Sequence, residues 1–414
     1  MLGAILGDII GSPYEKRRKK PINARDFPLF CENSRFTDDT VMTIAIGEGL
    51  LSRHEDTPNK TIQENIISSM QKWGREYPHA GYGKRFKHWI ESKNPQPYGS
   101  WANGSAMRVS SVGWLYKSLA RTLEVAKITA EVTHNHPDAI KGAQAVAGAI
   151  FKARNGASKK EIKDYVIRNF GYNLNQKLAE IIPNHSFDLS CAGTVRDAFI
   201  ALLEAESFEQ AIRNAISIGG DADTLAAICG SIAEPIFGIS DKLIQEVEKR
   251  ITPDMKVVLC NFFIERYGDG SDDIWNQLKW KESLENHFIS TISPDNIWAC
   301  AGAAGGAMGD PGTIKIIYTD EQKKIHYFYA NWASEEIDLD LLAKRFEPLN
   351  AFAKTGMPSK GWSFYYLGCG NSLLLKDEIY KIIIPYIKEI PEHEMYRKWF
   401  PLSMKILLRM GYFL

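Results

Sequence analysis

The chain has 414 residues, of which 44% are hydrophobic and 24% are charged. This length exceeds one typical hydrophobic core, so one large domain and a smaller one are expected. Lysine and arginine together number 50, as do aspartate and glutamate. The balance excludes a global attraction to nucleic acids or anionic membranes, so a stable nucleic-acid partner is not indicated.

The cysteines and the N-terminus point to a reducing compartment. Six cysteines are spread thinly without a CxxC pair, which is typical of neither a disulfide-stabilised protein nor a zinc site. The apolar start, MLGAILGDIIG, lacks a basic leading region and contains Asp8, so it is a poor signal peptide. No stretch approaches the ~18 uninterrupted apolar residues of a membrane span. We therefore expect a cytoplasmic protein without a membrane partner.

Helical periodicity dominates residues 1–266. Apolar residues recur at helical spacing in 41–45, 139–151 and 195–203, and convincing strand alternation is absent there. A helix over 207–218 runs into Gly219-Gly220. The following segment, 221–232, is alanine-rich and almost wholly apolar, as expected of a helix that is buried on all sides. The pattern predicts an all-α domain.

The composition changes after Tyr267. The polar, glycine-bearing run 268–273 is typical of a domain boundary. We therefore assign residues 1–266 to a helical catalytic domain and 267–414 to a smaller α+β accessory module of unknown role. In this module, β-rich runs at 313–318 and 325–332 flank 320–324 and indicate a hairpin, and 362–367 can add a strand. Helices are expected near 274–289 and 377–390.

Two acidic motifs lie where a loop becomes a helix. They are Thr37-Asp38-Asp39-Thr40 and Gly219-Gly220-Asp221-Ala222-Asp223-Thr224. Helix capping and dipole compensation explain either motif alone. Both motifs, however, precede apolar helices that would bury them, and four buried carboxylates without partners are very costly. A hard divalent cation such as Mg²⁺, Mn²⁺ or Ca²⁺ removes that cost, because it prefers carboxylate and hydroxyl oxygens.

Further candidate residues lie outside the acidic motifs. Between the motifs in the sequence is the small-residue turn Asn103-Gly104-Ser105-Ala106-Met107-Arg108, whose backbone N–H groups can approach a phosphate, although most such turns merely start helices. By itself, His134 is typical of a structural histidine and Glu15 of a solvated surface acid. The basic run 16–20 indicates a solvated face or a mobile loop first and an acceptor contact second.

Together and in this order, the motifs resemble a known family. The ordered set is G-D-x-x-G-x-x-x-E, T-D-D-T, N-G-x-x-M-R, T-H and G-G-D-A-D-T. It resembles the ADP-ribosylglycohydrolase family, which includes the enzyme that reactivates dinitrogenase reductase, over about residues 1–238. No family counterpart is recognised beyond about residue 267. Residues 301–310 faintly echo the opening Gly-Asp motif, but a close-packed helix or loop explains them as well.

The resemblance implies an all-α fold, a binuclear Mg²⁺ or Mn²⁺ centre and an ADP-ribose pocket. The implied metal ligands are Thr37, Asp38, Asp39, Asp221, Asp223 and Thr224. Glu15 corresponds to an acid near the metals. The implied substrate-binding residues are Asn103, Gly104, Ser105, Met107 and Arg108 in the turn and His134 beside the nucleotide.

The expected reaction is hydrolysis of the glycosidic bond between ADP-ribose and an acceptor. The metal pair would bind the ribose hydroxyls, orient the anomeric carbon and stabilise charge. The oxocarbenium-like state needs a carboxylate that manages protons, and Glu15 or a metal-ligand aspartate, Asp39 or Asp221, can serve. The diphosphate would lie against backbone N–H groups at a helix start, with His134 as a further donor.

Two alternatives stay open at this point. A non-catalytic ADP-ribose-binding protein of the same fold would be expected to lose an acidic ligand, and none is missing. A metal-dependent nucleotide or phosphodiester hydrolase also uses clustered aspartates and would release a free nucleotide from ADP-ribose. The sequence determines neither the acceptor, which ranges from arginine or serine to a nucleic-acid base or a small molecule, nor the oligomeric state.

Overall fold

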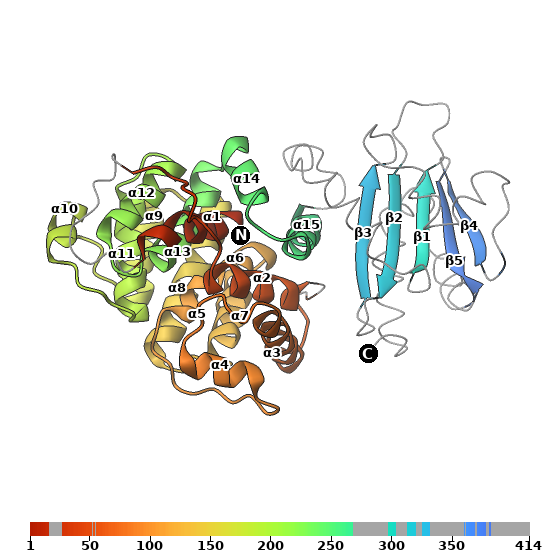
Figure 1. The fold of residues 1–414 in the computed structure, drawn as a ribbon, viewed down its shortest axis with the longest axis horizontal. Helices are drawn as coiled ribbons and strands as arrows, with labels where there is room; N and C mark the ends of the chain where they lie inside the picture. Colours follow the sequence, from red (N-terminus) through yellow and green to blue (C-terminus); the bar gives the residue numbers. More distant parts are fainter. Residues whose placement is uncertain are drawn as a thin grey trace. The chain divides into compact units, whose positions relative to one another are not determined.

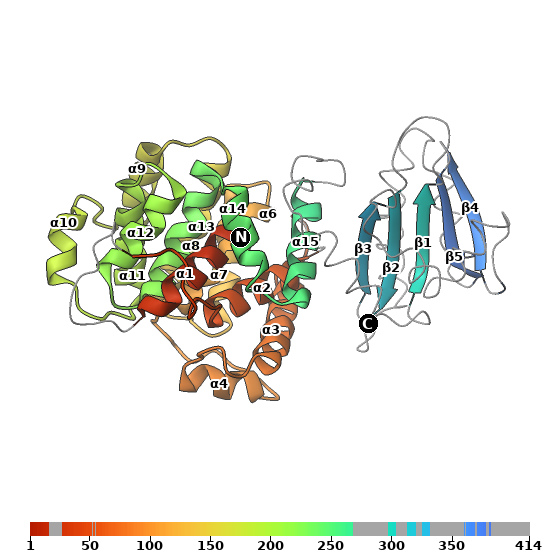
Figure 2. The same ribbon diagram turned by 45° about the horizontal axis from the view of Figure 1, so that its top comes forward.

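The computed structural model describes residues 1–15, 27–51, 53, 55–267, 297–303, 313–319, 325–331, 360, 362–368, 371–377 and 381. The chain divides into two compact units, Met1–Leu278 and Lys279–Leu414, which we name the helical unit and the strand unit (Figures 1 and 2). None of the described helices is long and apolar enough to cross a membrane. The domain boundary expected at residue 266 stays a prediction.

The described part of the helical unit consists of helices and connecting segments, with one isolated β-bridge between Ala102 and Ser190. The predicted all-α domain is therefore confirmed. The elements are α1 (Leu2–Gly11), η1 (Ser12–Tyr14), α2 (Asp38–Leu50), α3 (Asn59–Glu76), α4 (Lys84–Glu91), α5 (Gly104–Met107), α6 (Ser110–Leu115), α7 (Leu119–Glu131), α8 (Pro137–Arg154), α9 (Lys159–Phe170), α10 (Leu178–Ile181), η2 (Ile182–Asn184), α11 (Cys191–Leu203), α12 (Phe208–Ile218), α13 (Ala222–Phe237), α14 (Asp241–Glu248) and α15 (Pro253–Tyr267).

Helices α1 and α13 pack backbone against backbone inside the helical unit. A Cβ atom added to Gly7 would lie 2.0 Å from the carbonyl oxygen of Ala226, so a larger side chain would force the helices apart. All of α1 is buried, and so is α13 from residue 222 to residue 233. In both ribbon views α13 lies among α1, α8, α11 and α12. A Cβ added to Gly11 would lie 2.5 Å from the Cα atom of Asp223, so the end of α1 touches the start of α13.

Helix α2 begins at the first acidic motif. Thr37 is its N-cap residue, and the Thr37 hydroxyl accepts a hydrogen bond from the backbone N–H of Asp39 at 3.3 Å. From Asp39 onward the helix is buried, including the carboxylate of Glu48. Glu48 accepts hydrogen bonds from Lys72 and Trp73, each at 2.9 Å. Protein donors therefore compensate the buried charge at the C-terminal end of α2.

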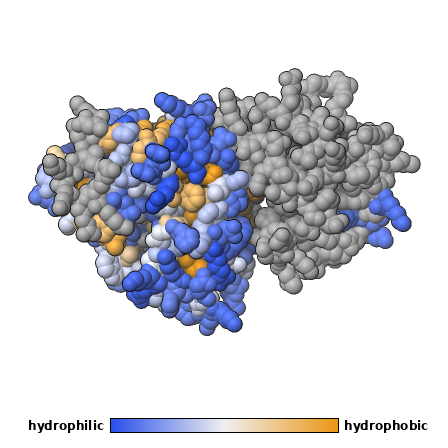
Figure 3. Space-filling view, viewed as in Figure 1, coloured by the Kyte–Doolittle hydropathy of each residue, from blue (hydrophilic) through white to orange (hydrophobic). Residues whose placement is uncertain are grey.

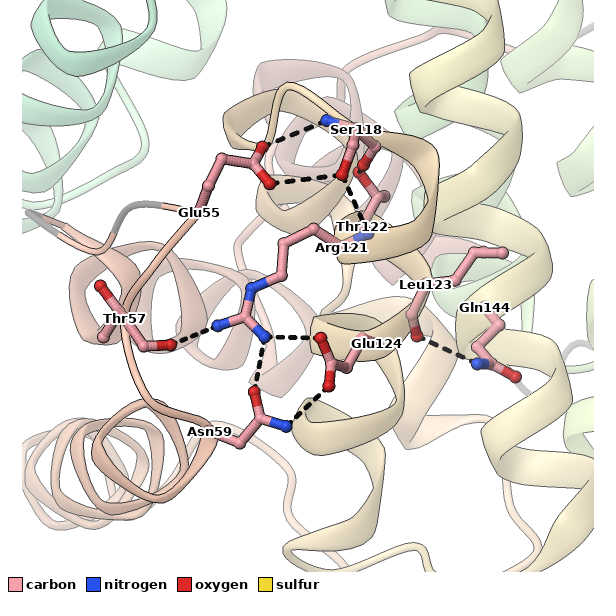
Figure 4. Close-up of polar contacts among 9 residues, drawn as sticks. All are labelled: Glu55, Thr57, Asn59, Ser118, Arg121, Thr122, Leu123, Glu124 and Gln144. Atoms are coloured by element: carbon pink, nitrogen blue, oxygen red, sulfur yellow. Dashed lines mark hydrogen bonds and ion pairs between the residues drawn. The ribbon is translucent and has the colours of Figure 1, made fainter.

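A polar network fastens the connection between α2 and α3 to the start of α7 (Figure 4). The carboxylate of Glu55 accepts hydrogen bonds from the backbone N–H and the hydroxyl of Ser118, at 3.1 and 3.3 Å. Arg121 donates to Asn59 Oδ1 at 2.5 Å and to Glu124 Oε2 at 2.6 Å. The amide of Asn59 in turn donates to Glu124 Oε1 at 2.7 Å. One of these contacts, from Glu55, supplies a partner for the backbone N–H of Ser118, the N-cap residue of α7.

The described surface of the helical unit is mostly hydrophilic. On the face shown in Figure 3, hydrophobic residues form small, separate patches among hydrophilic ones. Two large hydrophobic side chains of the described chain are exposed, Trp101 at 53% and Leu189 at 44%. They lie on paired segments, because Cys191 N donates to Trp101 O and Asn103 N donates to Leu189 O, each at 3.0 Å. This pairing brings Asn103 beside the segment that precedes α11.

The strand unit contains one antiparallel sheet with the strand order β3-β2-β1-β5-β4. Its strands are β1 (Ile297–Ala303), β2 (Thr313–Thr319), β3 (Ile325–Asn331), β4 (Trp362–Gly368) and β5 (Asn371–Lys376). The predicted hairpin is confirmed as the β2–β3 pair, and the predicted strand at 362–367 is β4.

Strand β1 corrects the sequence interpretation, and β5 was not predicted from the sequence. Residues 301–303 end β1, whereas the sequence suggested a close-packed helix or loop there. Their small side chains have low strand propensity, but β1 forms hydrogen-bonded ladders with both β2 and β5. The basic run 16–20, the helix expected near 274–289 and, apart from Asp377 and Lys381, the helix expected near 377–390 lie outside the described residues.

Candidate active site

The two acidic motifs meet at the N-termini of α2 and α13. Asp38 and Asp39 open α2, whereas Asp221 is the N-cap residue of α13 and Asp223 lies in its first turn. The hydroxyl of Thr224 donates a hydrogen bond to Asp39 Oδ2 at 3.2 Å and so joins the motifs directly. Residues 185 positions apart in the sequence are therefore neighbours.

The turn before α13 depends on two glycines. Gly219 and Gly220 have φ angles of +86° and +73°, in the region that side chains with a Cβ rarely adopt. This conformation lets the chain leave α12 at Ile218 and begin α13 at Ala222. The Gly-Gly pair thus brings the second acidic motif to the start of a buried helix.

Carboxylate oxygens gather in two overlapping groups. One oxygen each from Asp8, Asp39 and Asp223 lies within 4.8 Å of the others. The same holds for Glu15, Asp221 and Asp223. Asp223 belongs to both groups, so acids from α1, the segment after it, α2 and α13 surround one small volume. We name these five acids the acidic cluster.

Asp38 lies beside the acidic cluster. A Cβ on Gly81 would lie 2.9 Å from Asp38 Oδ1, so a residue without a side chain leaves room for this carboxylate. Burial raises the pKa of Asp38 to about 7, and the negative charges of Asp8 and Asp221 act in the same direction. Asp38 therefore shares the electrostatic environment of the cluster.

Burial also perturbs the aspartates of the cluster. It raises the pKa of Asp8 to about 6 and raises the pKa of Asp221. For Asp39 and Asp223, burial and neighbouring carboxylates raise the pKa well above its usual range. In the described part of the chain, none of these four aspartates forms an ion pair with a basic side chain. Without a basic partner among the described residues, these four aspartates retain protons at a pH where carboxyl groups are ordinarily ionised.

The residues present fit a divalent cation. Asp39 Oδ1 is buried and has no hydrogen-bond partner among the described residues. A buried polar atom without a partner costs about 1–3 kcal/mol, and more when it is charged. Carboxylate and hydroxyl oxygens are the ligands that Mg²⁺ and Mn²⁺ prefer. The predicted ligands of this kind are Thr37, Asp38, Asp39, Asp221, Asp223 and Thr224, and the geometry adds Glu15 beside them.

Glu15 lies at the cluster although its side chain is partly exposed. It follows η1 directly, and one of its carboxylate oxygens is within 4.8 Å of Asp221 and Asp223 oxygens. Its position thus differs from that of an ordinary solvated acid. Contact with both the cluster and solvent is the arrangement that proton transfer to or from water requires.

The predicted turn at 103–108 touches the cluster through Asn103. Its side-chain amide donates to Asp221 Oδ2 at 2.6 Å and to Thr194 Oγ1 at 3.2 Å. Ser105 anchors the turn to α8, because its hydroxyl donates to the carbonyl of Ala139 at 2.9 Å. Met107 is buried in the same turn. Asn103 is therefore placed to orient a predicted metal ligand.

Arg108 is connected to His134 through the hydroxyl of Thr133. The guanidinium is buried and donates to the carbonyl of Thr129 at 2.9 Å and to the hydroxyl of Thr133 at 2.8 Å. That hydroxyl lies 2.7 Å from His134 Nδ1. Because Thr133 accepts from an arginine, which cannot accept in return, its hydroxyl hydrogen is free to reach Nδ1. When the hydroxyl donates to Nδ1, neutral His134 carries its proton on Nε2.

The surroundings keep His134 neutral. Burial lowers the pKa of His134 well below its usual range, and the positive charges of Arg108 and Arg85 lower it further. A Cβ on Gly104 would lie 3.0 Å from His134 Nε2, so the glycine lets the predicted turn approach the donor edge of the imidazole. His134 thus lies next to Gly104, whose neighbour in the sequence, Asn103, bonds to Asp221.

Two features of the site were not identified from the sequence. Asp8 belongs to the G-D-x-x-G-x-x-x-E motif and interrupts an apolar run, and it was given no role in the site, yet its carboxylate belongs to the cluster. Trp101 precedes the turn by two residues and was not singled out, yet it is an exposed aromatic at the approach to Asn103. An acid inside an otherwise wholly apolar helix is the signal that could have identified Asp8.

Comparisons with known proteins identify one family. The sequence matches the family model for ADP-ribosylglycohydrolase over residues 1–261. It is 29% identical over 287 residues to an uncharacterised protein of Archaeoglobus fulgidus, covering 60% of this chain and 90% of that protein. It is 23% identical over 279 residues to the ADP-ribosylarginine hydrolase Tri1 of Pseudomonas putida, with 60% and 72% covered. It is 24% identical over 319 residues to the ADP-ribosylhydrolase ARH3 of Mus musculus, with 58% and 83% covered.

Proposed function

Because this chain belongs to the ADP-ribosylglycohydrolase family, we propose that it cleaves the glycosidic bond between ADP-ribose and an acceptor with the help of two Mg²⁺ or Mn²⁺ ions. The expected class of enzyme, a hydrolase that acts on ADP-ribosylated substrates, is confirmed by the family and by the named relatives. The metal requirement, the residue roles and the bond that is cleaved are our proposal.

One observation carries the proposal. Asp39 and Thr224, from motifs 185 positions apart in the sequence, are joined by a hydrogen bond, while Asp39 Oδ1 is buried and has no hydrogen-bond partner among the described residues. Helix capping alone gives no reason for the motifs to converge, because each could cap its own helix in solvent. A shared divalent centre explains both the convergence and the orphaned oxygen.

The positions of the acids in the cluster suggest a role for each of them in the reaction. The two metal cations, when bound, would supply positive charge that polarises the ribose hydroxyls beside the anomeric carbon. Cleavage breaks the bond from this carbon to the acceptor, and a water oxygen takes the acceptor's place. Glu15 is placed to accept the proton of that water, and Asp39 or Asp221 remains the alternative. The acceptor leaves with the proton that this carboxyl group took from water, so the carboxylate is regenerated.

The turn at 103–108 and His134 would hold the nucleotide. His134 offers Nε2–H as a neutral donor to a diphosphate oxygen, and Gly104 leaves room beside it. Asn103 steadies Asp221 through its 2.6 Å hydrogen bond. Ser105, Met107 and Arg108 support the pocket from behind, since Ser105 and Arg108 bond to neighbouring helices and Met107 is buried. The expectation that Arg108 binds substrate directly thus becomes a proposal that it acts through Thr133 and His134.

Other expectations stay predictions. Any acceptor contact by the basic run 16–20 is untested, as are the accessory role of residues 267–414 and the absence of a stable nucleic-acid partner. The cytoplasmic location is also a prediction, with which the free thiols of Cys31, Cys191 and Cys229 are compatible.

The test is a panel of ADP-ribosylated acceptors, including arginine, serine and a nucleic-acid end, assayed for free ADP-ribose with and without Mg²⁺ or Mn²⁺. We expect metal-dependent release from at least one acceptor, and loss of both release and Mn²⁺ binding in Asp39→Asn. Asp39 lies in the first turn of α2 and Thr37 is the N-cap residue, so a role limited to helix stabilisation would leave this variant active. Tight ADP-ribose binding without release would favour a binding protein, and AMP as the product would favour a phosphodiester hydrolase.

A further inference from the structure

Asp8 is a fully buried acid in the apolar helix α1 and accepts four hydrogen bonds from the first acidic motif. Its Oδ1 accepts from the hydroxyl of Thr37 at 2.7 Å. Its Oδ2 accepts from the backbone N–H of Thr37 at 2.8 Å and from the N–H and hydroxyl of Thr40 at 3.0 and 2.5 Å. One carboxylate thus binds both threonines that flank Asp38 and Asp39.

These bonds determine where the Thr37 hydroxyl presents its lone pairs. The hydroxyl hydrogen goes to Asp8, and one lone pair accepts from the backbone N–H of Asp39 at 3.3 Å. One lone pair of Thr37 Oγ1 therefore remains for a further partner. Oδ2 of Asp8, in contrast, already has three donors, so most of its accepting capacity is used within the protein.

We propose that Asp8 is a positioning residue for a divalent cation: it orients the Thr37 hydroxyl toward the cation and fixes the backbone of residues 37–40, so that Asp38 and Asp39 converge on it. The inference rests on the metal centre proposed above. It adds a role for a residue that the predicted ligand set leaves out.

The charge of Asp8 supports the same role. One of its oxygens lies within 4.8 Å of oxygens of Asp39 and Asp223, so Asp8 adds a further negative charge to a buried acidic group. A residue that served only to cap α2 would not need this charge, because a neutral acceptor also caps backbone N–H groups. A carboxylate here strengthens the attraction of the site for a divalent cation.

The close contact between helices explains how Asp8 reaches this position. Gly7 packs against the backbone of Ala226 in α13, and Asp8 is the next residue along α1. Helix α1 therefore carries a carboxylate into the space between the N-termini of α2 and α13. Helix α1 thus contacts both acidic motifs. Asp8 bonds to the first motif, and the helix packs against α13, which begins at the second.

The test compares Mn²⁺ affinity with stability in the full chain. We expect Asp8→Asn to lower Mn²⁺ affinity about 10–100-fold, the usual cost of losing a group that orients metal ligands. Because the substitution removes a buried charge, the Tm of the metal-free protein should stay equal or rise. Glu48→Gln is the matched control, since it alters a buried carboxylate at the far end of α2, and it should lower Tm and leave Mn²⁺ affinity within about twofold.

A second variant covers the case in which Asp8→Asn fails to fold. Thr40→Val removes one donor to Asp8 without touching a predicted ligand and should weaken Mn²⁺ binding several-fold. Wild-type Mn²⁺ affinity in Asp8→Asn or, if that variant does not fold, in Thr40→Val overturns the inference and leaves the metal centre intact. If the wild-type protein itself binds no Mn²⁺ in calorimetry, the metal centre and the inference fail together.

Discussion

At the scale of single residues, we propose that the buried pair of Arg108 and Thr133 sets the proton position on His134. The sequence interpretation placed Arg108 in the pocket because it ends the N-G-x-x-M-R motif. Its guanidinium bonds to Thr129 and Thr133, and we propose that it acts on the site through the imidazole of His134.

We predict that Thr133→Val weakens ADP-ribose binding about 5–10-fold, which corresponds to the loss of one hydrogen bond of roughly 1 kcal/mol. Without the hydroxyl, His134 Nδ1 loses its partner and the imidazole is free to exchange tautomers. Thr129→Val is the matched control, because the Thr129 hydroxyl bonds only within α7, to Ala126 O. Calorimetry with ADP-ribose measures both variants, and equal affinities would remove the proposed role of Thr133.

Glu15→Gln should leave ADP-ribose binding largely intact and slow release from an acceptor by ~10²–10⁴-fold, the usual contribution of a proton-handling group. The amide keeps the shape of the side chain beside Asp221 and Asp223 but cannot take a proton from water. Glu32→Gln, at an exposed acid, serves as the control. Steady-state release and ADP-ribose affinity are measured together. Unchanged turnover in Glu15→Gln would show that Glu15 has no role in proton transfer.

At the scale of elements, the α1–α13 contact determines whether the acids can meet. A methyl group on Gly7 would collide with the Ala226 carbonyl, which is backbone and cannot move aside as a side chain can. Gly83, the N-cap residue of α4, offers a contrast, because a Cβ added there meets nothing within 4 Å.

We predict that Gly7→Ala lowers the free energy of unfolding by about 1–3 kcal/mol or more, as overpacked cores do, and weakens Mn²⁺ binding with it. The control Gly83→Ala should stay within about 0.5 kcal/mol of the wild-type protein. Urea unfolding and Mn²⁺ calorimetry measure the two effects. A Gly7→Ala protein with wild-type stability would show that the helices separate more easily than the structure implies.

At the scale of the whole molecule, the acidic cluster should make stability without metal depend on pH. Burial raises the pKa of Asp8 to about 6 and of Asp38 to about 7, above their values in an unfolded chain. The folded state therefore binds more protons than the unfolded state between about pH 4 and pH 7. The stability that these protons contribute is present at low pH and is lost as the pH rises through the folded pKa values.

We expect the Tm of the metal-free protein to fall between pH 5 and pH 8 relative to that of Asp38→Asn, which cannot titrate at this position. Saturating Mn²⁺ should reduce this fall, because the cation replaces the protons, and the Mn²⁺-induced rise in Tm should grow with pH. Thermal unfolding at four pH values, with and without Mn²⁺, measures both effects. A wild-type Tm that rises with pH relative to the variant contradicts the proposed electrostatics.

A fragment that ends at Tyr267 should retain Mn²⁺ binding, because every proposed site residue lies before the end of α15. We expect the module at 267–414 to contribute to acceptor preference or solubility instead. Calorimetry on the fragment and the full chain compares their Mn²⁺ and ADP-ribose affinities. A folded fragment that binds neither would place part of the active site in the C-terminal module.

The elements that depend on local pattern were within reach of the sequence. The buried helix after Gly219-Gly220 follows from alanine-rich apolar composition, and the β2–β3 hairpin follows from two β-rich runs around a polar turn. Strands β1 and β5 could not be predicted in this way, because β1 has small residues and β5 is leucine-rich. Neither composition favours a strand without its neighbours. Their pairing partners, from other parts of the chain, supply the hydrogen bonds.

By itself, the sequence determined the candidate chemistry: acidic and hydroxyl residues before two apolar helices demand a charge partner, because burying unpaired carboxylates is costly. The tertiary structure decided which acids lie together. Asp8 joins Asp39 and Asp223 because α1 packs on α13 without a side chain at Gly7. Asn103 bonds to Asp221, and Arg108 turns toward Thr133, because helices distant in sequence fill the space around them. Periodicity and composition describe one segment at a time, whereas these contacts arise from the packing of several.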